Sequence, residues 1–119
     1  MAEMQIYRGG CHCGCVRYEV ETTLDPVISC NCSICQKQGS LWAFPKPEQF
    51  TLLSGADDLA DYQFNRKIIH HLFCRNCGVA PFARGKNADG SEAVSINVRC
   101  LDDLDLDALT LTPFDGKSL

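Results

Sequence analysis

Three cysteines fall within the segment CNCSIC, residues 30–35. If the chain is extended at Cys30 and Cys32, their sulfurs lie on the same side, because side chains alternate along a strand. If a helix begins at Cys32, then Cys32 and Cys35 share one of its faces, and the positive end of the helix favours thiolate over thiol. The spacing therefore predicts that the sulfurs of this cysteine trio (Cys30, Cys32 and Cys35) converge on one metal ion.

Four more cysteines form two short pairs that lie far apart in the sequence. In CRNCG, the two residues between Cys74 and Cys77 let both sulfurs point at one ion, and Gly78 can take the positive φ that closes the turn. In CHC, the two-residue period of an extended chain puts the sulfurs of Cys11 and Cys13 on one side. This cysteine quartet (Cys11, Cys13, Cys74 and Cys77) predicts a closed, structural zinc site.

The spacing alone leaves two alternatives open. Cys15 could replace Cys13 in the quartet, although we expect Gly14 to turn the backbone away after Cys13. The trio could gain a fourth ligand from Cys100, Cys15 or a histidine and so form a second closed site. It could instead leave one position to water or substrate, which is the arrangement of a catalytic zinc.

The ligand type limits the chemistry of an open trio. Three thiolates give a zinc site a net negative charge. Electron donation from sulfur also makes this zinc ion a weaker Lewis acid than a zinc ion bound by histidines. Such a site is less suited to generating hydroxide and better suited to binding an incoming thiol as thiolate. The trio therefore indicates a soft nucleophile as substrate.

A single cysteine and three histidines are the remaining candidates for chemistry. Cys100 could be a redox nucleophile if Arg99 lowered its pKa. Adjacent strand residues face opposite ways, however, so we expect a buried structural cysteine. His12 is expected to point to solvent. His70 and His71 occupy both faces of one predicted strand, so we expect one to be buried and one exposed, with a catalytic proton donor as the alternative.

Short strands must position these residues. Residues 16–21, VRYEVE, alternate between apolar and polar and predict a half-buried strand. A helical turn is expected from Cys32 to Gly39, and a short helix or 3₁₀ turn within residues 101–109. The result is a mainly β, antiparallel fold with few helical turns. Further short strands, separated by Gly, Pro, Asn and Asp, are predicted at residues 26–30, 41–44, 49–54, 61–65, 67–73, 80–84 and 93–100.

Composition excludes several classes of protein. The chain has 119 residues, 45% of them hydrophobic, with nine cysteines and a formal net charge of −4. We expect one domain over residues 1–119 and, without a basic footprint, no nucleic acid or membrane partner. No apolar run reaches the roughly 18 residues of a membrane span. No signal peptide is visible, so we expect a cytoplasmic protein. In the reducing cytoplasm, an odd number of cysteines in short clusters indicates metal binding rather than disulfide bonds.

Four ordered segments resemble one known family over nearly the whole chain. They are GGCHCGCVRYEVE, CNCSICQKQGSLWAF, LFCRNCGVAPF and SINVRCLDD, and the family is that of the glutathione-dependent formaldehyde-activating enzymes. The resemblance implies a β-tent fold, in which two small antiparallel sheets meet at an angle around zinc. It also implies two zinc ions per chain, a structural one at the quartet and a catalytic one at the trio, which favours the open site.

The family's named reaction joins glutathione and formaldehyde to give S-(hydroxymethyl)glutathione and is classed with the carbon–sulfur lyases. The resemblance therefore implies a zinc-dependent lyase that acts on a small thiol, such as glutathione, and a small aldehyde. Two alternatives stay open. One is a non-catalytic module in which both zinc ions are structural, and the other is a thiol redox enzyme that uses Cys100.

Two groups of side chains near the trio have more than one interpretation. Gln36, Lys37 and Gln38 are expected to be solvated helix residues, with binding of a glutathione carboxylate as the alternative. Trp42 and Phe44 lie two residues apart on a predicted strand. We expect both to fill the core, with a role in lining a substrate cleft as the alternative.

Overall fold

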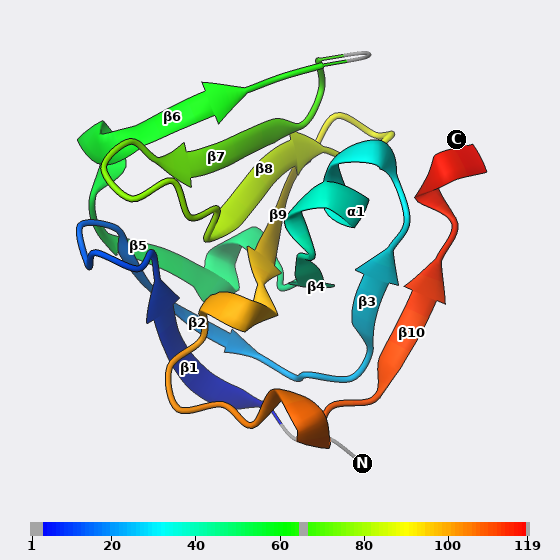
Figure 1. The fold of residues 1–119 in the computed structure, drawn as a ribbon, viewed down its shortest axis with the longest axis horizontal. Helices are drawn as coiled ribbons and strands as arrows, with labels where there is room; N and C mark the ends of the chain where they lie inside the picture. The colour runs from blue at the N-terminus through cyan, green and yellow to red at the C-terminus, as the bar shows by residue number, and fades with distance from the viewer. Residues whose placement is uncertain (1–3, 65–66, 119) are drawn as a thin grey trace.

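The computed structural model describes residues 4–64 and 67–118. Its regular structure is mainly β, arranged as two sheets that enclose a common core (Figure 1). The smaller sheet has three antiparallel strands in the order β1–β2–β5. Its strands are β1 (Gln5–Gly10), β2 (Arg17–Thr22) and β5 (Phe50–Ser54). The prediction of a mainly β fold with few helical turns is confirmed.

The larger sheet has seven strands in the order β10–β3–β4–β9–β8–β7–β6. Neighbouring strands are antiparallel except β10 and β3, which run parallel at one edge. Both sheets are therefore antiparallel apart from this one pair, which agrees with the mainly antiparallel fold expected from the sequence. The strands are β3 (Val27–Cys30), β4 (Leu41–Ala43), β6 (Leu59–Tyr62), β7 (His70–Cys74), β8 (Phe82–Lys86), β9 (Glu92–Asn97) and β10 (Leu111–Phe114).

Helical structure is confined to short pieces. One α-helix, α1 (Ser33–Gln38), follows β3, and Gly39 ends it in the left-handed conformation with φ 72°. The helix predicted between Cys32 and Gly39 is thus confirmed. Five 3₁₀ turns complete the described chain: η1 (Pro47–Gln49), η2 (Ala56–Asp58), η3 (Val98–Cys100), η4 (Leu106–Ala108) and η5 (Gly116–Ser118).

The alternation in residues 16–21 builds the centre of the core. Val16, Tyr18 and Val20 are fully buried, whereas the residues between them reach solvent. The Tyr18 ring packs against Phe50 and Phe82 with centroid distances of 5.2 Å and 6.0 Å, and its hydroxyl donates to the Pro81 carbonyl at 3.3 Å. These contacts tie the small sheet to the large one, since Phe82 belongs to β8.

Several predicted strand ends are wrong, for local reasons. The strand predicted at 93–100 ends at Asn97, whose side chain accepts a hydrogen bond from the Arg99 backbone and caps η3. The strand predicted at 67–73 begins only at His70, and the one predicted at 61–65 lies at 59–62, with residue 65 outside the described residues. In the described residues, no helix is long and apolar enough to span a membrane.

Candidate metal centres and the adjoining pocket

The quartet comes together at a junction between the two sheets. Its four Sγ atoms all lie within 4.8 Å of one another. The Sγ atom of Cys13 is 3.6 Å from those of Cys11 and Cys74. A tetrahedral zinc with Zn–S bonds of about 2.3 Å separates its sulfurs by about 3.8 Å, so the quartet has the spacing of such a site.

Two glycines shape the turns that carry the quartet. Gly14 has φ 88° and Gly78 has φ 81°, and both values lie in the left-handed region that glycine adopts without strain. The Gly78 backbone N–H donates to the Cys74 carbonyl at 2.8 Å, which closes the knuckle. Cys15 is not among the four sulfurs that lie within 4.8 Å of one another, and its carbonyl accepts a hydrogen bond from the Ser54 hydroxyl.

The trio lies where β3 runs into α1. Its three Sγ atoms are within 4.8 Å of one another, because Cys30 ends an extended strand and Cys32 is the N-cap of the helix that contains Cys35. The Cys32 backbone N–H points at the Cys30 sulfur at 3.4 Å. The indole N–H of Trp42 donates to the Cys35 sulfur at 3.2 Å. Both of these outer donors favour thiolate sulfur.

The trio thiols differ in their proton affinity. Burial raises the pKa of Cys35 to about 12, against the opposing hydrogen bond from Trp42. Burial also acts to raise the pKa of Cys32, but hydrogen bonds from the backbone and thiol of Cys35 outweigh it, so that this pKa is lowered. A metal ion that binds here must displace protons from the thiols, and its affinity must therefore fall in acid.

In the described part of the chain, no fourth Cys, His, Asp or Glu joins the trio within 4.8 Å of all three sulfurs. Of the candidates that the sequence offered, His71 borders the same pocket as the trio, whereas Cys15 and Cys100 do not line it. Cys100 is in η3, with its sulfur 3.7 Å from the Ala80 carbonyl, and burial raises its pKa to about 11. The Arg99 guanidinium donates to the Gly39 carbonyl at 2.6 Å, so Arg99 and Cys100 do turn to different partners.

The trio opens into a pocket of about 410 Å³. Its floor is a row of residues across the large sheet, because directly paired residues of neighbouring strands share a face. His71 pairs with Ala83, and Ala83 pairs with Ser95. In a second row, Trp42 pairs with Ile28. All five of these residues line the pocket together with the three cysteines.

The C-terminal segment closes one side of the trio. β10 lies beside β3, and the chain end lies near the start of α1 (Figure 1). The Asn31 side chain holds this segment by donating to Asp115 at 3.0 Å and accepting from the Lys117 backbone at 2.9 Å. Gly116 touches the trio so closely that a Cβ atom there would lie 2.6 Å from the Cys30 sulfur. We define residues 111–118 as the C-terminal strap; sequence reasoning missed it.

Two expectations about nearby aromatic residues and histidines are wrong. Trp42 is buried, but Phe44 is 63% exposed because β4 ends at Ala43 and Pro45 follows. Phe44 lines the pocket, as does Phe114 of the strap. His70 and His71 are both half-buried, since each face of β7 borders a hollow. His71 lines the trio pocket, whereas the His70 ring pairs with Asp61 at 2.6 Å.

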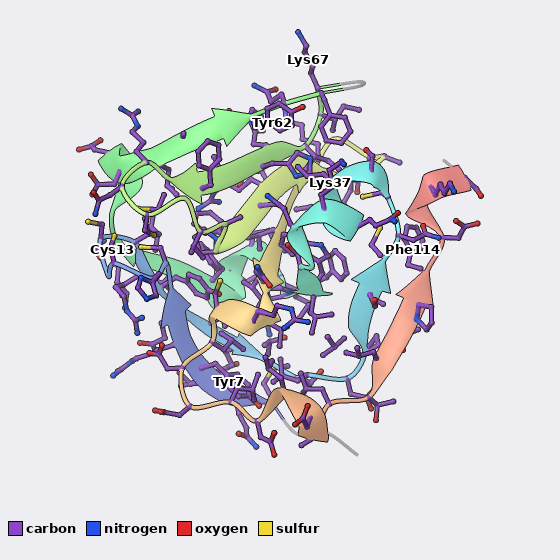
Figure 2. The ribbon with its side chains drawn as sticks, viewed as in Figure 1. Tyr7, Cys13, Lys37, Tyr62, Lys67 and Phe114 are labelled. Carbon is purple, nitrogen blue, oxygen red and sulfur yellow. The ribbon has the colours of Figure 1, made fainter. Side chains whose placement is uncertain are left out.

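Other sequence candidates lie away from the trio pocket. His12 is exposed, as expected. Lys37 does not line the trio pocket but shares a separate hollow with Tyr62 and Phe64, and Figure 2 shows Lys37 beside Tyr62. The same view places Cys13 of the quartet and Phe114 of the strap on opposite sides of the molecule (Figure 2). The two cysteine clusters are thus separate centres.

Comparisons with known proteins agree with this arrangement. The family model described as "Glutathione-dependent formaldehyde-activating enzyme" matches residues 6–113. A crystal structure of a Rhodobacter sphaeroides protein is similar, with a TM-score of 0.78 and 30% sequence identity. That alignment covers 89% of this chain and 97% of the other. The match over nearly the whole chain, with both cysteine clusters inside it, shows that this protein belongs to the glutathione-dependent formaldehyde-activating enzyme family.

Proposed function

We propose that this protein is a zinc-dependent carbon–sulfur lyase of the S-(hydroxymethyl)glutathione synthase type. It joins a small thiol, such as glutathione, to formaldehyde or a related aldehyde. In the net reaction the thiol sulfur forms a bond to the carbonyl carbon, the C=O π bond breaks, and the thiol proton is transferred to the oxygen. Family membership supports the two reactants, and the trio beside a pocket supports a reacting centre.

Both clusters fit zinc by their donor set. The quartet offers four thiols at tetrahedral spacing, which suits a structural ion. The trio offers three thiols, and among the residues that the structure covers no fourth donor joins them. Bound there, zinc would supply a position at which the sulfur of an incoming thiol is held as thiolate.

The chain's own residues orient the trio and shape the space beside it. The Trp42 indole and the Cys32 backbone fix the Cys35 and Cys30 sulfurs by hydrogen bonds. His71 lies in the same pocket, and burial lowers its pKa, so its ring is neutral near pH 7 and can both donate and accept a hydrogen bond. In this proposal the His71 ring binds the hydroxyl group of the adduct through one of its nitrogens.

The observation that carries the proposal is a three-sulfur cluster that faces a pocket. It is tested by exchange NMR of adduct formation from glutathione and formaldehyde, together with zinc content. We expect zinc-loaded protein to accelerate exchange and Cys32→Ser to abolish the acceleration while keeping the quartet ion. Cys15→Ser is the matched control and should behave as the wild type. No acceleration by the fully loaded protein, or full acceleration by Cys32→Ser, would instead favour a module with purely structural metal.

A further inference from the structure

The pocket beside the trio is much larger than formaldehyde and almost entirely apolar. Formaldehyde has two heavy atoms and displaces about two waters, or about 60 Å³, whereas the pocket measures about 410 Å³. Apart from the trio, its lining consists of six apolar residues and two polar ones, His71 and Ser95. Formaldehyde alone would leave most of this apolar surface facing water.

The body of glutathione does not match these walls either. Glutathione carries two carboxylates and one ammonium group, and each loses hydration when it is buried without a partner. Among the described residues that line the pocket, none is Lys, Arg, Asp or Glu. The charged groups of glutathione are therefore expected to stay outside the pocket. The space beside the trio can then take an uncharged group.

Three large apolar side chains around the pocket remain in contact with water. Phe44, Ile69 and Phe114 are 63%, 50% and 48% exposed, and they come from three separate segments of the chain. Together with Trp42 and Ile28 they surround one hollow rather than forming a flat patch. Apolar walls with a few polar groups are typical of sites that take a small organic molecule and orient its polar end.

Building on the proposed function, we infer that the electrophile of this protein is an aldehyde with an uncharged, apolar substituent of branched or aromatic type. In this arrangement the carbonyl group lies at the trio, and the substituent lies against the apolar walls that include Phe44, Ile69 and Phe114. The product is a hemithioacetal: a C–S bond forms, the C=O π bond opens, and the thiol proton is transferred to the oxygen. No oxidant or reductant is needed, because the reaction is an addition.

Binding can be tested without the reaction, because Trp42 is the only tryptophan of the chain and lines the pocket. The probe is isoamyl alcohol, the reduced counterpart of isovaleraldehyde, and methanol is the matched counterpart of formaldehyde. We expect isoamyl alcohol to change the Trp42 fluorescence of zinc-loaded protein saturably, with an affinity about tenfold or more above that of methanol. Free tryptophan amide gives the solvent effect to be subtracted.

Two wall variants and one control locate the probe. Phe114→Ala and Phe44→Ala should each weaken isoamyl alcohol binding several-fold without loss of zinc, since both side chains are exposed walls and not ligands. Leu53→Ala is the control, because Leu53 is 53% exposed on β5 and does not line the pocket. The inference is overturned if the alcohol does not bind, or if the control variant weakens binding as much as the wall variants do.

Activity and assembly provide the remaining outcomes. With glutathione as the thiol, exchange NMR should show greater acceleration for isovaleraldehyde than for formaldehyde. Acceleration of formaldehyde alone, without binding of the alcohol, overturns the inference and leaves the proposed function standing. Binding of the alcohol without acceleration of any aldehyde overturns the proposed function instead. A dimer seen by sedimentation that buries Phe44 and Phe114, and that the alcohol does not dissociate, would assign this surface to a second copy and also overturn the inference.

Discussion

Substitution of Gly116 by alanine tests whether the C-terminal strap belongs to the trio. A Cβ atom on Gly116 would lie 2.6 Å from the Cys30 sulfur and 3.1 Å from the Cys32 Cβ atom. Non-bonded heavy atoms normally approach to about 3.5–4.0 Å, so the overlap with the sulfur is about 1 Å. Gly116 does not use the left-handed backbone region. The strain of Gly116→Ala therefore comes from this contact, and either the Cys30 sulfur or the strap must move.

We expect Gly116→Ala to weaken zinc at the trio while leaving the quartet unchanged. Loss of an outer-shell contact typically lowers metal affinity about 10–100-fold, and a displaced ligand falls in the same range or above it. Competition with a chromophoric chelator should therefore resolve two ions, only one of which is released more easily. Gly85→Ala is the matched control, because its new Cβ would make only an ordinary contact of 3.6 Å with Ile69. Equal zinc release in the two variants would refute the role given to the strap.

Three further predictions concern the two centres and the pocket. Cys13→Ser should lose about one zinc ion per chain and unfold at a lower temperature, whereas Cys15→Ser should keep both ions. Metal analysis and thermal unfolding measure both effects. The reverse result would make Cys15, and not Cys13, the zinc ligand. Cys100→Ser should retain zinc and exchange activity, since its sulfur faces the Ala80 carbonyl and burial raises its pKa to about 11; loss of activity with zinc intact would favour redox chemistry. Burial lowers the pKa of His71, so below about pH 6.5 the unfolded chain binds a proton that the folded chain does not, and the folded state loses stability in acid. We therefore expect the unfolding temperature of His71→Phe to fall less between neutral and acid pH than that of the wild type. Parallel plots of unfolding temperature against pH for the two proteins would contradict this.

Local patterns in the sequence were enough to predict the geometry of each cysteine cluster. The two-residue period at Cys11 and Cys13 placed both sulfurs on one side, and Gly14 and Gly78 took the positive φ values that those turns require. The helix starting at Cys32 is likewise a local feature, ended by Gly39. These features depend on a few neighbouring residues, for which backbone sterics leave few choices.

Long-range features could not be predicted in the same way. β10 contains Pro113, is exposed throughout and pairs in parallel with β3, so it shows neither alternation nor a burial pattern. Its contact with the trio through Gly116 depends on how the chain end folds back, which no short-range spacing encodes. The floor of the pocket also depends on strand order and register, because it combines residues such as His71 and Ser95 from different strands.

Cadmium NMR of protein loaded with two cadmium ions tests the central claim most directly, since each ion has its own resonance and its shift follows the number of sulfur ligands. Our account predicts one resonance at the position of a four-sulfur site and a second at that of a site with fewer sulfurs. Adding a small thiol should move the second resonance toward the four-sulfur position and leave the first unchanged. Two four-sulfur resonances before any thiol is added, or no movement of either resonance afterwards, would contradict an open coordination position at the trio.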